Sequence, residues 1–357
     1  MRSTSSGRKS LAIDLQPQTQ PAAELAIKIV SNRDQPMRLR TAIASAAILI
    51  ALLAPAAAQN WPTRQPIKLI VPFPAGSALD TIGRPVFEQV GKQIGQTFVF
   101  ENRPGAGGTL GMAQVAKADP DGYTLLLNSS IQTIVPTTYA KLPFDTAKDF
   151  AAVIPLGQFP NVLIAPAGRF KSVQDLVAKA KAKPGSITYG SGGIGAATHP
   201  NAERFRLAAG FEALHVPFKG APEAVREVLG GRVDFYFSPL PSVVALIQGH
   251  KLDGLALSSL KRDDALPEIP TTLEAGYPNS EYTFWLGVFA PSGTPKEIVQ
   301  RLHDAIAKAL DEPSIKAKVK QLGADPMPMK PAEFEAFLKA ETASNAMLIK
   351  AAGIKPN

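Results

Sequence analysis

Four short corners carry most of the polar chemistry that the sequence offers. All four follow predicted strands and are rich in backbone N–H groups and hydroxyls: Ala75-Gly76-Ser77, Ser129-Ser130, Ser191-Gly192-Gly193 and Lys219-Gly220. In open α/β sheets, ligands bind at the carboxyl edge where such corners meet. Helix N-termini that follow such corners offer free N–H groups to an anion, which could be a nucleotide phosphate or a carboxylate. Because donors outnumber acceptors, a carboxylate fits better, and because few general acids or bases converge there, catalysis is disfavoured.

One of these corners contains the letters of a dinucleotide-binding fingerprint. Gly190, Gly192 and Gly195 follow a predicted strand and precede a predicted helix. The fingerprint also needs an acidic residue at the end of the next strand to contact a ribose. Here Glu212 lies before that strand, so a helix start that needs small residues explains the glycines at least as well.

Signatures of hydrolases and metal sites are incomplete. Ser191 is flanked by glycine, but Tyr189 stands at the first glycine position of the G-x-S-x-G nucleophile motif. The four histidines show no metal-ligand spacing, and the chain has no cysteine for a thiolate site. We therefore expect no enzyme activity, no cofactor and no metal.

Two further side chains each have two interpretations. Asp80 could accept a hydrogen bond from a ligand amine, or it could stabilise the first turn of the helix that follows, an effect of about 0.3–1 kcal/mol that we favour. His199 follows the third corner and could contact a ligand or cap a helix, and the sequence favours neither interpretation over the other.

The N-terminal part reads as an export signal. Within residues 37–58, Arg38 and Arg40 precede a small, apolar run that ends in three alanines, which indicates a cleaved signal peptide. A membrane anchor is the alternative, but the run is short of the ~20 apolar residues that a spanning helix needs. Residues 1–36 are polar and aperiodic, and we interpret them as a spurious or disordered extension ahead of Met37.

Charge and cysteine content narrow the class of protein. Residues 1–58 carry seven of the 38 basic and three of the 30 acidic residues, so the remainder has a net charge of +4. No basic cluster of nucleic-acid type occurs in that remainder, and no nucleic-acid partner is expected. Without cysteine there is no lipid attachment site after the signal, so the sequence predicts a free periplasmic protein, which we expect to be a monomer.

Beyond residue 58 the chain alternates predicted strands and helices, which indicates an α/β fold with mainly parallel sheets flanked by helices. Thr294 and Glu297 predict an N-terminal capping box for one helix. Two extended apolar stretches, 155–168 and 282–293, predict crossings between two lobes, made of residues 59–158 plus 283–357 and of residues 159–282. The ligand would bind in the cleft between them, as in hinged binding proteins. The expected strands are 67–71, 97–101, 124–128, 162–165, 187–189, 214–217, 233–237, 255–258 and 286–290.

Several stretches, taken in order over nearly all of residues 61–340, resemble a known family. They include WPTRQPIKLIVPFPAGSALD, VFENRPGAGGTLGMAQVAKADPDGYTLLL, ITYGSGGIGAATH, HVPFKGAPEAVREVLGGRVDFYF, IPTTLEAGYP and WLGVFAPSGTPKEIV. The sequence resembles the substrate-binding proteins of tripartite tricarboxylate transporters, also called the Bug family. This resemblance implies a two-lobed, type II-like periplasmic binding protein that closes around one small ligand. It also implies a di- or tricarboxylate, an acidic amino acid or an aromatic acid as that ligand, and membrane permease subunits as partners.

The resemblance also implies which residues bind the ligand. The family corner that holds a carboxylate matches Phe73, Pro74, Ala75 and Gly76, and further matching positions are Ser129, Ser191, Thr198 and Lys219. Ser77 replaces the second glycine of the family, and Pro200 replaces a leucine, so selection at the far end of the ligand stays open. Two alternatives also stay open: a binding protein that feeds a sensor kinase, and a nucleotide-dependent enzyme that uses the Gly190 corner.

Overall fold

The computed structural model describes residues 61–351, 353, 354 and 356. The expected extension at 1–36 and the expected signal peptide at 37–58 lie outside the described residues. In the part of the chain that is described, no helix combines the length and the apolar character needed to cross a membrane.

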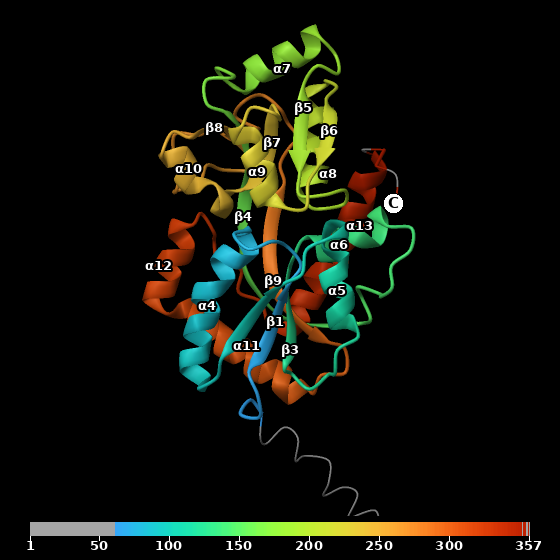
Figure 1. Ribbon diagram of the computed structural model, residues 1–357, viewed down its shortest axis with the longest axis vertical. Helices are drawn as coiled ribbons and strands as arrows, with labels where there is room; N and C mark the ends of the chain where they lie inside the picture. The colour runs from blue at the N-terminus through green and yellow to red at the C-terminus, as the bar shows by residue number, and fades with distance from the viewer. Residues whose placement is uncertain (1–60, 352, 355, 357) are drawn as a thin grey trace, which may run out of the picture. The chain divides into compact units, whose positions relative to one another are not determined.

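Nine strands within the described residues form one curved sheet (Figure 1). Their order across the sheet is β2-β1-β3-β9-β4-β7-β5-β6, and β8 pairs with β4 beside this path. The strands are β1 Ile67–Val71, β2 Phe98–Asn102, β3 Thr124–Ser129, β4 Phe150–Pro166, β5 Thr188–Ser191, β6 Leu214–Pro217, β7 Phe235–Pro239, β8 Leu252–Leu257 and β9 Thr283–Pro291.

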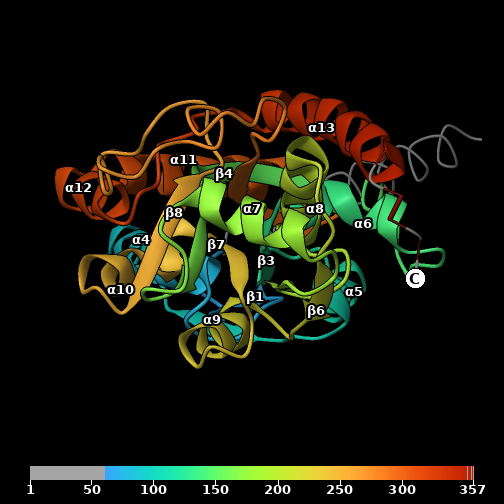
Figure 2. The ribbon, with the colours of Figure 1, turned by 90° about the horizontal axis from the view of Figure 1, so that it is seen from above.

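Helices lie between most of these strands, which confirms the predicted α/β class. The helices are α4 Ala78–Ile94, α5 Thr109–Ala116, α6 Ile131–Thr138, α7 Val173–Ala182, α8 Thr198–Ala209, α9 Ala221–Leu229, α10 Val244–Gln248, α11 Lys296–Asp311, α12 Pro313–Gln321 and α13 Pro331–Ala351. Seen from above, α13 runs beside α6 (Figure 2), and it also packs against β4.

The sheet has two sections joined by its two long strands. The first section contains β1, β2 and β3, the second contains β5 to β8, and β4 and β9 run between them (Figure 1). The pairs β1–β2, β1–β3, β5–β6 and β5–β7 are parallel, while every antiparallel pair in the described chain involves β4 or β9. The sheet is therefore mixed because of the joining strands. The residue boundaries expected for two lobes stay a prediction.

The sections have separate hydrophobic cores. Along β4, Val162 and Ile164 pack into a core on one face of the second section, while Leu163 and Ala165 pack into a core on the other face. Successive side chains of a strand point to opposite faces, so this strand is covered on both sides. The first section has its own core, in which Trp285 is fully buried.

Two local expectations need correction. The strand expected at 162–165 is the end of the much longer β4, whose first part was read only as an extended crossing. The expected capping box at Thr294 is wrong, because its hydroxyl donates to the Pro291 carbonyl (2.7 Å) and α11 begins at Lys296 without a side-chain cap.

Candidate functional site

The corner between β1 and α4 is held by its own side chains. The Gly76 N–H donates to Oδ2 of Asp80 (3.1 Å), and the Ser77 N–H donates to the Pro74 carbonyl (3.2 Å). Gly76 has a φ of 80°, a left-handed conformation that favours glycine. The N–H groups of Gly76 and Ser77 are thus engaged within the corner, and the exposed Ala75 and Gly76 lie outside the cavity described below.

Asp80 organises this corner through the hydrogen bonds of its carboxylate. Besides Gly76, its carboxylate accepts hydrogen bonds from Arg84 (2.9 Å) and more weakly from Asn102 (3.4 Å). Burial by itself would raise the pKa of Asp80, but the hydrogen bonds from Arg84, Gly76 and Asn102 outweigh it and hold that pKa below its ordinary value. The carboxylate therefore fixes the loop that leads into α4, and it does not line the cavity.

A small cavity lies where three helices begin. Ser77, Ala78 and Leu79 line it from the start of α4, Ala196, Ala197 and Thr198 from the start of α8, and Ala221 from the start of α9. The first residues of a helix have N–H groups without intrahelical partners, and Ser77 and Ala197 make no side-chain cap. The cavity thus faces three partly positive helix ends.

The rest of the cavity wall is apolar or carries hydroxyls. Phe73, Gly192, Tyr236, Pro239 and Phe284 complete it, and no charged side chain lines it. The cavity volume is about 30 Å³.

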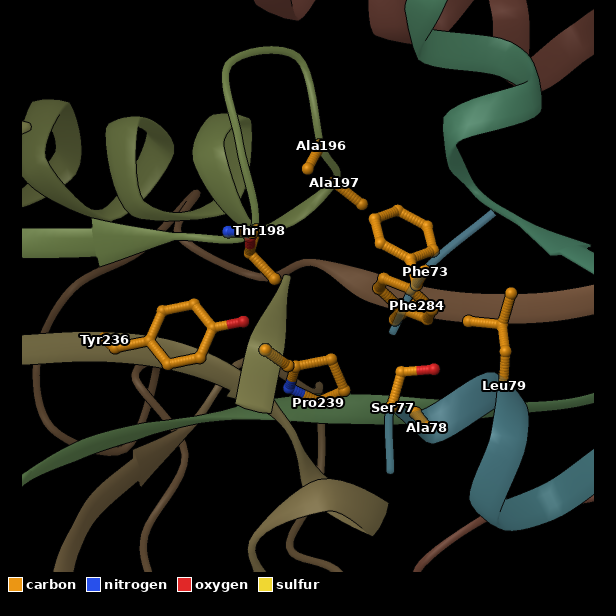
Figure 3. A pocket seen from close by; sticks show the side chains of 12 residues that line it. Phe73, Ser77, Ala78, Leu79, Ala196, Ala197, Thr198, Tyr236, Pro239 and Phe284 are labelled. Carbon is orange, nitrogen blue, oxygen red and sulfur yellow. The ribbon is translucent and has the colours of Figure 1, made fainter. Parts of the chain in front are cut away.

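Two buried hydroxyls in this wall have no hydrogen-bond partner in the structure, those of Ser77 and Tyr236. Figure 3 shows the Tyr236 ring with its hydroxyl directed into the space beside Thr198 and Pro239. Burial raises the pKa of Tyr236, an effect that the neighbouring Thr198 side chain partly offsets. Because a buried hydroxyl without a partner costs stability, both groups are prepared to bind something that enters the cavity.

Four of the residues expected to bind ligand line this cavity: Phe73, Ser77, Gly192 and Thr198. Thr198 also fixes the neighbouring loop, since its hydroxyl accepts the Gly192 N–H (2.9 Å). The other expected residues lie elsewhere.

Ser129 ends β3 and Ser130 follows it, and neither residue lines the cavity. Ser130 joins β3 to β9, because its N–H donates to the Trp285 carbonyl (3.2 Å) and its Oγ accepts the Trp285 N–H (3.1 Å). The Ser129 hydroxyl is buried and has no hydrogen-bond partner. Ser130 therefore serves the strand connection.

Ser191 and His215 superficially resemble a nucleophile and its base. The Ser191 hydroxyl lies 2.6 Å from Nε2 of His215 and accepts the Gly193 N–H (3.1 Å). Burial, and secondly the nearby His199, lower the pKa of His215 to about 3, so its ring is neutral and can accept a hydrogen bond from the Ser191 hydroxyl. Ser191 is fully buried and does not line the small cavity, so this pair fixes the glycine loop.

His199 stacks on His215 with ring centroids 4.0 Å apart, and burial lowers its pKa. It lines a separate surface pocket together with His215, Tyr189, Glu203 and Arg206. Lys219 and Gly193 line a third hollow beside Tyr139, and Gly220 faces the ring of Pro74. The structure thus does not bring His199, Gly193, Lys219 or Gly220 to the small cavity.

Sequence reasoning missed eight of the twelve lining residues: Ala78, Leu79, Ala196, Ala197 and Ala221 at the helix starts, and Tyr236, Pro239 and Phe284 on the strands. Pro239 ends β7 at the carboxyl edge, so the rule that selected the other corners could have found it. Tyr236 and Phe284 lie inside apolar strands that read as core, and nothing in the sequence separates them from core residues. Among the residues that the structure covers, no group of three or more metal-ligating side chains lies together.

Solved structures of periplasmic binding proteins share this mixed α/β fold. A sequence model described as the tripartite tricarboxylate transporter family receptor matches residues 82–354, and the chain belongs to this family. The family is one of solute-binding receptors, as the resemblance predicted.

Individual relatives agree with this assignment. Protein BugT of Bordetella pertussis is 33% identical over 307 residues, covering 85% of this chain and 94% of BugT. The solved structure of Rpa4515 from R. palustris with adipate has a TM-score of 0.80 and 34% identity, and covers 83% of this chain and all (100%) of that one. MatC from Rhodopseudomonas palustris with bound malate has a TM-score of 0.77 and 27% identity, covering 80% of this chain and 99% of MatC.

Proposed function

We propose that this protein is an extracytoplasmic solute-binding protein that captures a small carboxylate and delivers it to a tripartite tricarboxylate-type membrane transporter. One observation carries the proposal: three helix N-termini meet at a cavity that holds two buried hydroxyls without partners. The adipate and malate in the two solved relatives support a carboxylate as the class of ligand.

The electrostatics of the cavity suit an anion. Each helix N-terminus is equivalent to roughly half a positive charge, and such ends bind carboxylates through their free N–H groups. With no charged side chain in the wall, a bound carboxylate would have no carboxylate neighbour to repel it. The hydroxyls of Ser77 and Tyr236 would each gain a hydrogen bond, which is worth more when the group is otherwise buried and unpaired.

The size of the cavity indicates a closed conformation. A single water needs about 10–15 Å³ of such volume, so a cavity of about 30 Å³ is too small for a dicarboxylate. We therefore propose that residues 59–158 plus 283–357 and residues 159–282 form two lobes that separate about β4 and β9 to admit the ligand. A ligand drives closure to the extent that it binds the closed state better than the open one.

Residues 37–58 direct export to the periplasm and are removed, and the product is a monomer that carries no lipid and no cofactor.

The Gly190 corner is not used for a nucleotide. The loop that it opens is packed against protein, since a Cβ on Gly195 would lie 2.6 Å from the Thr138 hydroxyl. Ser191 is not a nucleophile because its hydroxyl is occupied and buried.

A thermal-shift screen tests the class of ligand. The panel contains adipate, malate, citrate, glutamate and benzoate, with NAD and ATP as controls. A ligand present at 100 times its Kd stabilises the folded protein by about 2.7 kcal/mol, so a carboxylate at that level should raise the melting temperature clearly. A shift with a nucleotide and none with any carboxylate would refute the proposal.

A further inference from the structure

Gly220 stands where the two sections of the protein meet. It precedes α9 in the second section, and its backbone is extended (φ 162°, ψ 176°), a conformation that any residue can adopt. A Cβ placed on it would nevertheless lie 2.6 Å from Cδ and 3.1 Å from Cγ of Pro74. The obstacle to a side chain at position 220 is therefore this neighbour and not the local backbone.

Pro74 belongs to the corner after β1, in the first section, and it cannot move aside easily. Its Cδ is bonded to its own backbone nitrogen, so it lacks the freedom of the end of a long side chain. The corner is held in turn by the hydrogen bond from Gly76 to Asp80. A methyl group at position 220 would have to push the two sections apart.

The same kind of contact recurs along this boundary. A Cβ on Gly107, in the first section, would lie 2.7 Å from the Ile194 carbonyl oxygen of the second section, and one on Gly195 would lie 2.6 Å from the Thr138 hydroxyl of the first section. The sections thus leave no room for a side chain at these three glycines. Gly220 differs from Gly107 and Gly195 because its φ does not itself require glycine.

We infer that Gly220 acts as a closure-permitting residue: the missing side chain at this position allows the Pro74 corner to seat against α9, and it sets the affinity for ligand without contacting it. This inference rests on the proposed closure of two lobes. A side chain at position 220 leaves each lobe intact, removes the closed state and so weakens binding of every ligand by the same factor.

The test is Gly220→Ala, with Gly190→Ala as the matched control. A Cβ on Gly190 would meet only atoms of the second section, at 3.5–3.6 Å, which is ordinary packing distance. Because the chain has no cysteine, Lys92→Cys and Lys181→Cys can be introduced for spin labels, one on α4 and one on α7. Pulsed electron spin resonance then gives the closed and open populations of the full chain without ligand, with adipate and with malate.

We expect Gly220→Ala to lower the ratio of closed to open protein at least tenfold relative to Gly190→Ala, and to weaken adipate or malate binding by the same factor. The ligand-free melting temperature should match that of the control. In a Pro74→Ala background, where the obstructing ring is absent, the effect of Gly220→Ala should shrink to less than threefold.

Equal closed fractions in Gly220→Ala and Gly190→Ala would overturn the inference, and so would a wild-type protein that shows no closed population under any condition. If neither carboxylate changes the distances but Gly220→Ala still lowers the closed fraction of the ligand-free protein, the inference stands and the proposed ligand class fails.

Discussion

Glu341 on α13 offers a sharp test of the energetics of the first section. Its Oε2 accepts hydrogen bonds from Nε1 of Trp285 on β9 (2.7 Å) and from the hydroxyl of Thr133 on α6 (2.9 Å). Among the described residues, no cationic side chain contributes to the pKa of Glu341. Burial raises the pKa of Glu341 from an ordinary 4.5 to about 7, an effect that the hydrogen bonds from Trp285 and Thr133 only partly offset.

The raised pKa of Glu341 makes the free energy of unfolding depend on pH. The folded state holds the proton of Glu341 more tightly than the unfolded state, so its contribution to stability is fully present below about pH 4.5 and is lost as the pH rises through 7. At about 1.4 kcal/mol per pKa unit, the loss reaches roughly 3 kcal/mol above pH 8. This is an upper limit, because solvent screens the exposed part of the side chain.

Glu341→Gln should remove this loss, since glutamine can keep both hydrogen bonds but cannot ionise. We expect the variant to equal the wild type near pH 4.5 and to exceed its free energy of unfolding by up to roughly 3 kcal/mol at pH 8. Urea denaturation followed by tryptophan fluorescence measures this, because Trp285 is one of two tryptophans in the chain. Glu335→Gln, at an exposed position of the same helix, is the control. Parallel pH profiles for Glu341→Gln and wild type would refute the reasoning.

Three further outcomes are expected. Tyr236→Phe should leave the ligand-free melting temperature unchanged or higher, because it removes a buried hydroxyl without a partner, and should weaken carboxylate binding about tenfold by calorimetry. Asp80→Asn should lower thermal stability at pH 7, where the depressed pKa of Asp80 favours folding, with a smaller difference at pH 3; an equal difference at both pH values would contradict this. Because the pKa of His215 is depressed, this residue contributes fully to the stability of the folded state above pH 6.5. That contribution is lost as the pH falls toward 3, and the loss is at most about 2 kcal/mol at pH 5. His215→Gln should flatten that acid limb in thermal melts, and an unchanged limb would exclude this histidine as its source.

The sequence located strands well where turn residues bound an apolar run. β1 was predicted at both ends, because Pro72 and the following corner stop it sharply. β4 was recognised only at its end, because Pro155 and Gly157 interrupt its first part. The structure has register shifts at Ala152/Ile154 and Pro155/Gly157, which are the irregularities that let proline and glycine lie within a strand.

Part of the site was predictable from the corners that follow strands. Ser77 and Gly192 were expected because the carboxyl ends of parallel strands meet at one edge, whereas Phe73 and Thr198 were expected only from the family resemblance. The role of Asp80 could not be read from the sequence, since a helix-dipole effect and a hydrogen bond to Gly76 need the same residue at the same place. Tyr236 was not predicted as a site residue, because a hydroxyl lacks a partner only as a result of how distant residues pack around it.

The pairing of β3 with β9 has a consequence for how the chain acquires its structure. Leu126 pairs with Phe289, about 160 residues away, whereas β5 to β8 come from one continuous stretch. Closing a loop of that length costs about 4.5 kcal/mol plus a constant in the simple chain-entropy estimate. Until β9 has emerged, β3 remains a bare edge strand, and bare edges attract other chains. The strands of the second section need no partner from so far along the chain, so all of them can pair before β9 emerges.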